Sequence, residues 1–102
     1  MKILALEKDR EGIKGKDFQS LLKEEAVTVW NLYQKNIIRE IYFRADRSNA
    51  ILILECDSVE QAKDILTQLP LAKNELIDFE VIPLEPYPGF LRLFDEQHSQ
   101  KM

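Results

Sequence analysis

Cysteine and histidine are almost absent from this chain of 102 residues, which has one of each, Cys56 and His98. One cysteine cannot form an internal disulfide or a cysteine-rich metal cluster. One histidine near the C-terminus leaves no candidate for Ser-His-Asp or Cys-His catalysis, and none for an axial haem ligand in a core. Cys56 ends an apolar segment, so we expect a small buried side chain rather than a nucleophile. We therefore predict neither a metal site nor a cofactor.

Long apolar runs and an excess of positive charge are also missing. Lysine and arginine total 14 against 18 aspartates and glutamates, a formal net charge of −4, so a large electropositive surface for nucleic acid is not expected. The longest apolar runs, such as residues 50–54, are far shorter than the roughly 20 residues that span a bilayer. No charged-then-apolar secretion signal opens the chain. These absences favour a cytoplasmic protein that binds neither nucleic acid nor membrane.

What the sequence does contain is a hydrophobic pattern that predicts six elements in the order β-α-β-β-α-β. The strands are expected at residues 2–7, 37–45, 50–56 and 76–82, and the helices at 17–35 and from Asp57 or Ser58 to Pro70. This order predicts a ferredoxin-like α+β sandwich, in which two helices cover one face of a four-stranded antiparallel sheet. Residues 1–94 are expected to form a single domain with a C-terminal arm at 84–94, followed by a disordered tail at 95–102.

Particular residues are expected to set the ends of these elements. Asn36 is expected to end the first helix, because asparagine tolerates left-handed geometry. Asp57 and Ser58 each fit the first position of a capping box at the start of the second helix. Pro70 is expected to stop that helix, with a connection after it, and Pro83 is expected to end the last strand.

The two faces of the predicted sheet differ in character. The face under the helices should hold Ile37, Ile41, Phe43, Ile77, Phe79 and Val81, with either Leu4 and Leu6 or Ile3 and Ala5. The other face should carry Ile38, Glu40, Tyr42, Arg44, Asp78, Glu80 and Ile82. This face is too apolar to be fully exposed to solvent. It is also too charged to form a hydrophobic core, because burying an unpaired carboxylate costs several kcal/mol. Two such faces packed across a two-fold axis would bury the apolar rows, so we predict an obligate homodimer; the alternative is a monomer that binds a partner transiently.

The segment 84–94 combines prolines with many apolar side chains. It has too much proline for a helix at its start and too many apolar groups for a free tail. Two interpretations stay open. In one, the segment packs on its own subunit, and in the other it is an arm that covers a neighbouring subunit.

Four segments carry a resemblance to a known family: 38–45 (IREIYFRA), 57–60 (DSVE), 68–71 (QLPL) and 77–81 (IDFEV). In combination they resemble the muconolactone isomerase-like group of the dimeric α+β barrel superfamily. The resemblance implies a ferredoxin-like protomer, two sheets that form a barrel across a dimer, and in some members larger rings of dimers. It also implies isomerisation of a lactone by movement of a double bond, without a cofactor or metal.

The resemblance further implies that a glutamate on the first helix moves the proton, and the nearest positions are Glu25 and, as an alternative, Glu24. A carboxylate in a partly dry cleft can do this when its pKa is raised toward neutral. Glu25 falls at the edge of the apolar stripe, between Phe18 and Val29. That position suits a site, and it also suits a side chain that reaches out to solvent.

A ligand cavity on the sheet is the second functional expectation. We predict that it is lined by Arg39, Glu40, Tyr42, Arg44 and Glu80. An arginine beside a tyrosine suits a carboxylate-bearing small molecule, because the guanidinium donates two parallel hydrogen bonds. The alternative is a network of salt bridges between subunits. Trp30 is expected to form a wall or lid of the cleft, or to pack at a helix edge.

Three functions therefore stay open. The first is a homo-oligomer that binds a small organic ligand, carboxylic or lactone-like, between sheet and helices. The second is a cofactor-independent isomerase that uses Glu25. The third is a structural or regulatory oligomer without a ligand.

Overall fold

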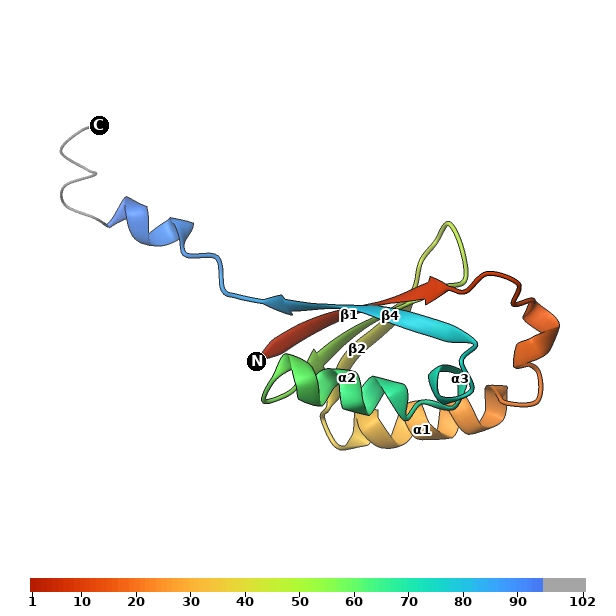
Figure 1. Ribbon diagram of the computed structural model, residues 1–102. Helices are drawn as coiled ribbons and strands as arrows, with labels where there is room; N and C mark the ends of the chain where they lie inside the picture. Colours follow the sequence, from red (N-terminus) through yellow and green to blue (C-terminus); the bar gives the residue numbers. More distant parts are fainter. Residues whose placement is uncertain (95–102) are drawn as a thin grey trace.

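A computed structural model describes residues 1–94 of the chain and has the predicted α+β architecture (Figure 1). The elements are β1 (Lys2–Asp9), a 3-10 turn η1 (Gly15–Phe18), α1 (Leu22–Gln34), β2 (Ile38–Phe43), β3 (Ala50–Glu55), α2 (Val59–Thr67), α3 (Pro70–Lys73), β4 (Ile77–Leu84) and a second 3-10 turn η2 (Gly89–Leu93). The strands form one antiparallel sheet in the order β2-β3-β1-β4. The α-helices all lie on the same side of it (Figure 1). The predicted tail at 95–102 lies outside the described residues.

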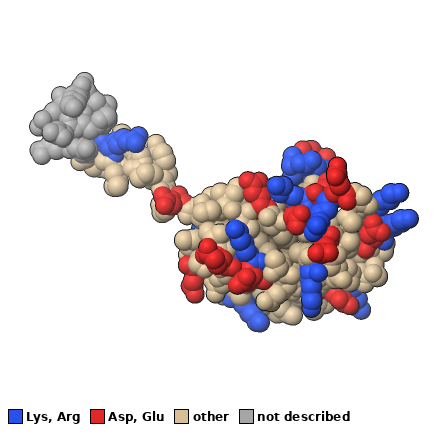
Figure 2. Space-filling view, in the orientation of Figure 1, with Lys and Arg blue, Asp and Glu red and all other residues tan. Residues whose placement is uncertain are grey.

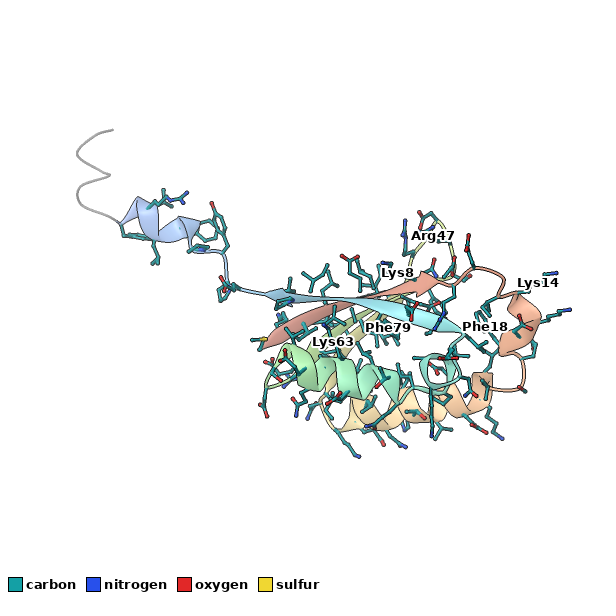
Figure 3. All side chains as sticks on the ribbon, viewed as in Figure 1. Lys8, Lys14, Phe18, Arg47, Lys63 and Phe79 are labelled. Carbon is teal, nitrogen blue, oxygen red and sulfur yellow. The ribbon has the colours of Figure 1, made fainter. Side chains whose placement is uncertain are left out.

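The hydrophobic core lies between the sheet and α2. Ile3 and Ala5 of β1 are fully buried and pair with Leu54 and Leu52 of β3, and Leu66 of α2 belongs to the same cluster. Of the two sets left open for the first strand, Ile3 and Ala5 therefore face the helices. Phe79 of β4 packs against this core from the same side (Figure 3). Burial of such side chains contributes roughly 1.5–3 kcal/mol each, which makes this layer the main source of stability.

A β-bulge in β2 changes which of its side chains face the helices. Ile38 pairs with Leu54, whereas Glu40 pairs with Ile53, so Arg39 is an extra residue in the ladder. Ile38 is therefore on the helix side and is 0% exposed, and the prediction that it lies on the open face is wrong. Strict alternation had placed Ile38 with Glu40, because a period of two cannot accommodate an inserted residue. Beyond the bulge the alternation resumes.

The observed ends of α1 and α2 agree with the predicted ends only in part. Asn36 ends α1 with a left-handed φ of 63°, as predicted. Ser58 is the N-cap of α2, and its Oγ accepts the N–H of Gln61 at 3.0 Å. The first helix, however, begins at Leu22 rather than near residue 17, because η1 and a turn precede it.

Two prolines behave differently from the prediction. Pro70 does not lead into an irregular connection but begins the short helix α3, a position where its fixed φ and missing N–H are tolerated. Pro83 does not end the last strand, since β4 continues through it to Leu84. β4 is an edge strand, and proline is accepted there.

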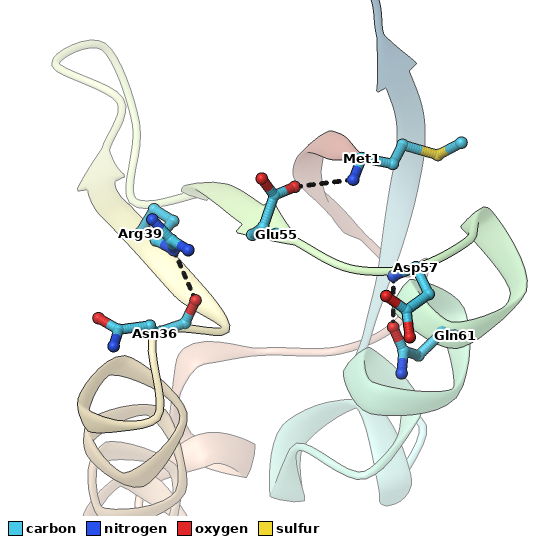
Figure 4. Close-up of polar contacts among 6 residues, drawn as sticks. All are labelled: Met1, Asn36, Arg39, Glu55, Asp57 and Gln61. Carbon is cyan, nitrogen blue, oxygen red and sulfur yellow. Dashed lines mark hydrogen bonds and ion pairs between the residues drawn. The ribbon is translucent and has the colours of Figure 1, made fainter.

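Further polar contacts secure the strand and helix ends at one side of the sheet (Figure 4). The amino group of Met1 pairs with Glu55 at 2.9 Å, which holds the start of β1 against the end of β3. The N–H of Asp57 donates to Gln61 Oε1 at 2.6 Å. This second contact complements the Ser58 cap and fixes the first turn of α2.

The sheet face away from the helices is not covered by any element within residues 1–94. Two rows cross it, Tyr42-Ile51-Leu6-Glu80 and Glu40-Ile53-Leu4-Ile82. Ile51, Ile53, Leu4 and Leu6 at the centre are each only partly exposed. Charged side chains of this face, such as Glu40 and Glu80, are exposed at its margins. The face is therefore an apolar strip with a charged border, whereas the sequence predicted only that apolar and charged side chains would mix on it.

Residues 85–94 leave the body of the molecule as an extended arm (Figure 1). Its apolar side chains are exposed, and Phe94 reaches 81%. Most of the described part of the arm is tan in Figure 2. By sequence, Glu85 and Arg92 are the charged residues among 85–94. The rings of Tyr87 and Phe90 pack edge to face with centroids 5.1 Å apart. The arm thus has local structure but does not pack on its own subunit, and the interpretation that it does is wrong.

Candidate functional site

A cavity of about 890 Å³ lies between α1 and the β2 half of the sheet. None of the residues of α1, which forms one side of the cavity, is buried. Trp30 of α1 is 56% exposed, and Phe43 on the facing side of β2 is 71% exposed. The lining is mainly apolar and includes Phe18, Leu22, Val29, Ile41, Phe43 and Ala50. A smaller pocket of about 240 Å³ lies between α2 and β4, at the other end of the sheet.

Glu25 lies in the wall of this cavity, in the first turn of α1. Its Oε1 accepts the N–H of Leu71 at 2.9 Å, and Leu71 is the second residue of α3. Burial raises the pKa of the Glu25 carboxyl; the hydrogen bond from Leu71 lowers it in part, and repulsion from Glu7 raises it further. The side chain is therefore a partly dry carboxylate held by a backbone donor.

A second carboxylate, that of Glu7, lines the same cavity and was missed by the sequence analysis. Its Oε1 accepts the N–H of Ala50 at 3.1 Å, and its Oε2 accepts the amide of Asn49 at 3.3 Å. Burial raises the pKa of Glu7, and these hydrogen bonds lower it in part. A signal was present, because Glu7 continues the alternation of Ile3 and Ala5 onto the helix-covered face, where a carboxylate is unusual.

Asn49 connects the carboxylates of β1 to the turn that joins β2 and β3. It is the one buried polar residue among residues 1–94, with 4% exposure. Besides Glu7, its side-chain amide donates to Asp9 Oδ1 at 2.9 Å. The backbone carbonyl of Asn49 accepts the N–H of Arg44 at 3.0 Å. Asn49 therefore fixes the end of β1 and the position of Glu7.

Three of the five predicted ligand-binding residues, Arg39, Glu40 and Tyr42, are among the residues that line the cavity. Glu40 and Tyr42 belong to the rows of the open sheet face, so they border the cavity at the edge that β2 forms. The hydroxyl of Tyr42 donates to Glu40 Oε1 at 2.7 Å, and this bond raises the pKa of Tyr42. Arg39 Nε donates to the carbonyl of Asn36 at 2.6 Å (Figure 4). This contact leaves other guanidinium donors of Arg39 for a ligand.

Arg44 and Glu80, the other two, lie elsewhere. Arg44 donates to both carboxylate oxygens of Asp46, at 2.9 and 2.6 Å, and this pairing lowers the pKa of Asp46. Glu80 lies on the open face of the sheet, opposite Leu6. Neither residue lines the cavity.

Of the two alternatives left open for Trp30, the structure favours a place in the cavity wall. Trp30 and Tyr33 stack with ring centroids 5.9 Å apart and an interplanar angle of 27°, and both line the cavity. Cys56 is buried, and burial raises the pKa of its thiol, as suits the predicted structural role. Within residues 1–94, no group of three or more His, Cys, Asp and Glu side chains is placed to hold a metal ion. The same residues include no helix that is long and apolar enough to span a membrane.

The fold is that of the ferredoxin-like α+β proteins, and solved structures share it. Muconolactone isomerase matches with a TM-score of 0.70 at 23% identity, over 87% of this chain and 93% of the other. The 5-chloro-2-hydroxyhydroquinone dehydrochlorinase of Burkholderia phenoliruptrix AC1100, in complex with 2,5-dihydroxybenzoquinone, matches with a TM-score of 0.60 at 20% identity, over 87% and 98% of the two chains. No family model and no curated protein matches the sequence. The predicted resemblance to the muconolactone isomerase-like group is thus confirmed at the level of the fold.

Proposed function

We propose that this protein binds a small organic molecule, carboxylic or lactone-like, in the cavity between α1 and the sheet, and that it does so in the cytoplasm. The observation that carries the proposal is the cavity itself. Its volume of about 890 Å³ lies within the usual range of small-molecule sites, which are mainly apolar with a few fixed polar groups. Here those groups are Glu7, Glu25 and Arg39, with Glu40 and Tyr42 at the β2 edge of the cavity.

Arg39 is the group that would orient an acidic ligand. It is the one cation among the described residues that line the cavity. Its guanidinium can donate two parallel hydrogen bonds to a carboxylate, a geometry that lysine cannot reproduce. The apolar wall formed by α1 would then hold the rest of the ligand, with Trp30 and Tyr33 against its face.

A cofactor-independent isomerase is the second candidate, and the environment of Glu25 favours it. A carboxylate whose pKa is raised by burial can remove a proton next to a carbonyl group and return it at another carbon. The hydrogen bond from Leu71 would hold Glu25 in one orientation during both transfers. Muconolactone, the compound named in the enzyme of similar fold, is the natural first substrate to test.

We also propose that the protein is a homodimer and that its arm contacts a further copy. The half-buried apolar strip around Leu4, Leu6, Ile51 and Ile53 would be covered by the same strip of a second chain. The exposed apolar side chains of 85–94 would be covered by a neighbouring subunit, which could extend dimers into a ring. Arg44 and Glu80, which lie outside the cavity, would then serve at or near such contacts rather than at the ligand.

Thermal shift measurements with benzoate, other small carboxylic acids and muconolactone test the binding proposal. We expect at least one probe to raise the melting temperature of the wild type, and we expect Arg39→Ala and Tyr42→Ala to reduce the shift. We expect Glu25→Gln to change the shift as well, because Glu25 lines the cavity. Glu24→Gln, on the same helix turn but outside the cavity lining, is its matched control and should leave the shift unchanged. An unchanged melting temperature across all probes would favour an oligomer without a ligand.

A further inference from the structure

We propose that the cavity selects an elongated monocarboxylic acid that carries a hydrogen-bond donor, hydroxyl or ammonium, at the end opposite its carboxylate. The inference rests on the proposed function of the cavity as a ligand site and narrows the class of ligand. Three charged residues of the lining, Glu7, Glu25 and Arg39, support it, because they are divided between two ends of the cavity.

Arg39 and Glu25 lie at opposite ends of α1. Glu25 is in the first turn of this helix, whereas Arg39 donates through its Nε to the carbonyl of Asn36, just beyond the last turn. Gln34 is the last residue of α1, and the rise of an α-helix places it about 14 Å along the axis from Glu25. The cation and this carboxylate are therefore well separated along the cavity.

The facing strand β2 shows the same separation. Arg39 lies near its start, and Phe43, its last residue, is on the order of 10–13 Å farther along the strand. Phe43 pairs with Ala50, whose N–H is bound by Glu7. The start of α1 and the turn between β2 and β3 lie toward the same end of the molecule (Figure 1). The cavity thus has a basic end at Arg39 and an acidic end at Glu7 and Glu25.

The acidic end offers a ligand one carboxylate oxygen in particular, Oε2 of Glu25. Oε1 of the same group accepts the N–H of Leu71 at 2.9 Å, and no residue among 1–94 donates a hydrogen bond to Oε2. Both oxygens of Glu7 already accept hydrogen bonds, from Ala50 and from Asn49. Glu7 therefore adds negative charge to this end, and Glu25 supplies the acceptor.

The two ends also differ in their exposure to water. Arg39 is exposed, whereas Glu7 and Glu25 are half-buried, and burial raises the pKa of both carboxyl groups. An acid would therefore keep its carboxylate hydrated at Arg39. Its apolar body would extend along Val29 and Trp30, which line the cavity between the two ends, and its far end would reach Glu25.

A hydrogen-bond donor is the group that suits this far end. A methyl group would cover Oε2 of Glu25 with carbon and remove it from water without a partner, which is unfavourable. A second carboxylate would be repelled by the charges of Glu7 and Glu25. A hydroxyl or an ammonium group would instead replace the lost water by a hydrogen bond to a charged oxygen.

A cavity that recognises only an apolar body with one acid group predicts the opposite order of affinities. A terminal hydroxyl must be taken out of water on binding, and this is unfavourable when no acceptor is present. Such a cavity would bind decanoate more tightly than 10-hydroxydecanoate. The order of affinity within one pair of ligands thus separates the two accounts.

The test is isothermal titration calorimetry of the wild type at pH 7.5, with acids of one chain length kept below the concentrations at which they form micelles. We expect 10-hydroxydecanoate or 10-aminodecanoate to bind about tenfold more tightly than decanoate, as is usual for a hydrogen bond to a charged group. The larger of the two gains identifies hydroxyl or ammonium as the preferred donor. Decanedioate should bind more weakly than decanoate. The isomeric control is 2-hydroxydecanoate, whose hydroxyl stays beside the carboxylate, and it should gain nothing.

Variants assign the preference to particular residues. Glu25→Gln keeps an oxygen for the N–H of Leu71 but replaces the free acceptor by a donor, so the advantage of the two donor-bearing acids should disappear and decanedioate should gain affinity. Glu24→Gln, outside the cavity lining, should keep the order found in the wild type. Arg39→Ala should weaken all of these acids and leave their order unchanged.

The order measured in the wild type needs no variant, so a misfolded Glu25→Gln protein would not obscure the result. Decanoate that binds as tightly as both donor-bearing acids would overturn the inference and leave the proposed function in place. A complete absence of binding, here and in the thermal shift screen, would instead reject the proposed function together with the inference.

Discussion

The backbone N–H of Leu71 donates to the carboxylate of Glu25 across 46 positions of sequence, with a distance of 2.9 Å between Leu71 N and Glu25 Oε1. This bond joins α3, which pattern analysis did not predict, to α1, whose glutamate it did single out. It places a carboxylate in a partly dry wall and fixes its orientation. The orientation of the Glu25 carboxylate therefore depends on a helix of four residues that begins at a proline.

Removal of the Glu25 charge should stabilise the protein at neutral pH. The pKa of Glu25 is higher in the folded protein than in the unfolded chain. As the pH rises, Glu25 therefore ionises first in the unfolded chain, and the free energy of unfolding falls until the pH passes the folded-state pKa. Glu25→Gln keeps an acceptor for the N–H of Leu71. Urea unfolding should show Glu25→Gln more stable than the wild type at pH 7.5 and nearly equal at pH 3.5, below the ordinary pKa of glutamate. A variant less stable than the wild type at pH 7.5 would contradict this account.

Asn49→Ala should destabilise the fold by about 1–3 kcal/mol, because it removes a buried amide and leaves two carboxylates without their shared donor. The lost contacts are those to Glu7 and Asp9. Urea unfolding at pH 7 measures the effect. Ser48→Ala, at the neighbouring exposed position of the same turn, should change stability by less than about 0.5 kcal/mol. Equal effects of the two variants would show that Asn49 has no special role.

Arg39→Ala should weaken binding of a carboxylic probe by about 10- to 100-fold, since a hydrogen bond to a charged group contributes roughly 1.5–3 kcal/mol. Arg39→Lys should recover only part of the loss, because lysine cannot form the two parallel bonds. Isothermal titration calorimetry with the best probe from the thermal shift screen gives both values. Arg44→Ala is the control, because Arg44 pairs with Asp46 and does not line the cavity. A greater loss of affinity in Arg44→Ala than in Arg39→Ala would show that Arg44, and not Arg39, binds the acidic probe.

The order of strands and helices could be predicted from periodicity because the elements turn an apolar stripe toward the core, fully buried on β3 at Leu52 and Leu54 and partly buried on α1 at Val29 and Leu32. The bulge at Arg39 could not be predicted from periodicity. The residues before and after the inserted residue have the same kinds of side chain, so the sequence does not show where the alternation shifts. Glu7 was missed for a related reason. Its role depends on Ala50 and Asn49, which are more than 40 residues away, and local patterns carry no information about such partners.

If the open sheet face is a dimer interface, a charged substitution at its centre should dissociate the dimer. Ile51→Lys places a cation at the centre of the apolar strip, next to Leu6, and burying it against a second copy would be strongly unfavourable. We expect sedimentation to show the wild type at twice the chain mass of 12.0 kDa or a multiple of that, and Ile51→Lys at the monomer mass. Val27→Lys, an exposed apolar position on α1, should leave the assembly unchanged. A wild type that sediments as a monomer would reject the dimer.

Truncation after Leu84 tests the arm separately from the sheet. Residues 85–94 expose Tyr87, Phe90 and Phe94 and leave the body of their own subunit, so their removal should hardly change the unfolding of the domain. If the arm packs on a neighbouring copy, the truncated protein should lose assemblies larger than the dimer and keep the dimer itself, because the strip around Ile51 is intact. Light scattering at several concentrations measures both species. Identical assembly of the full-length and truncated chains would mean that the arm contacts something other than a second copy.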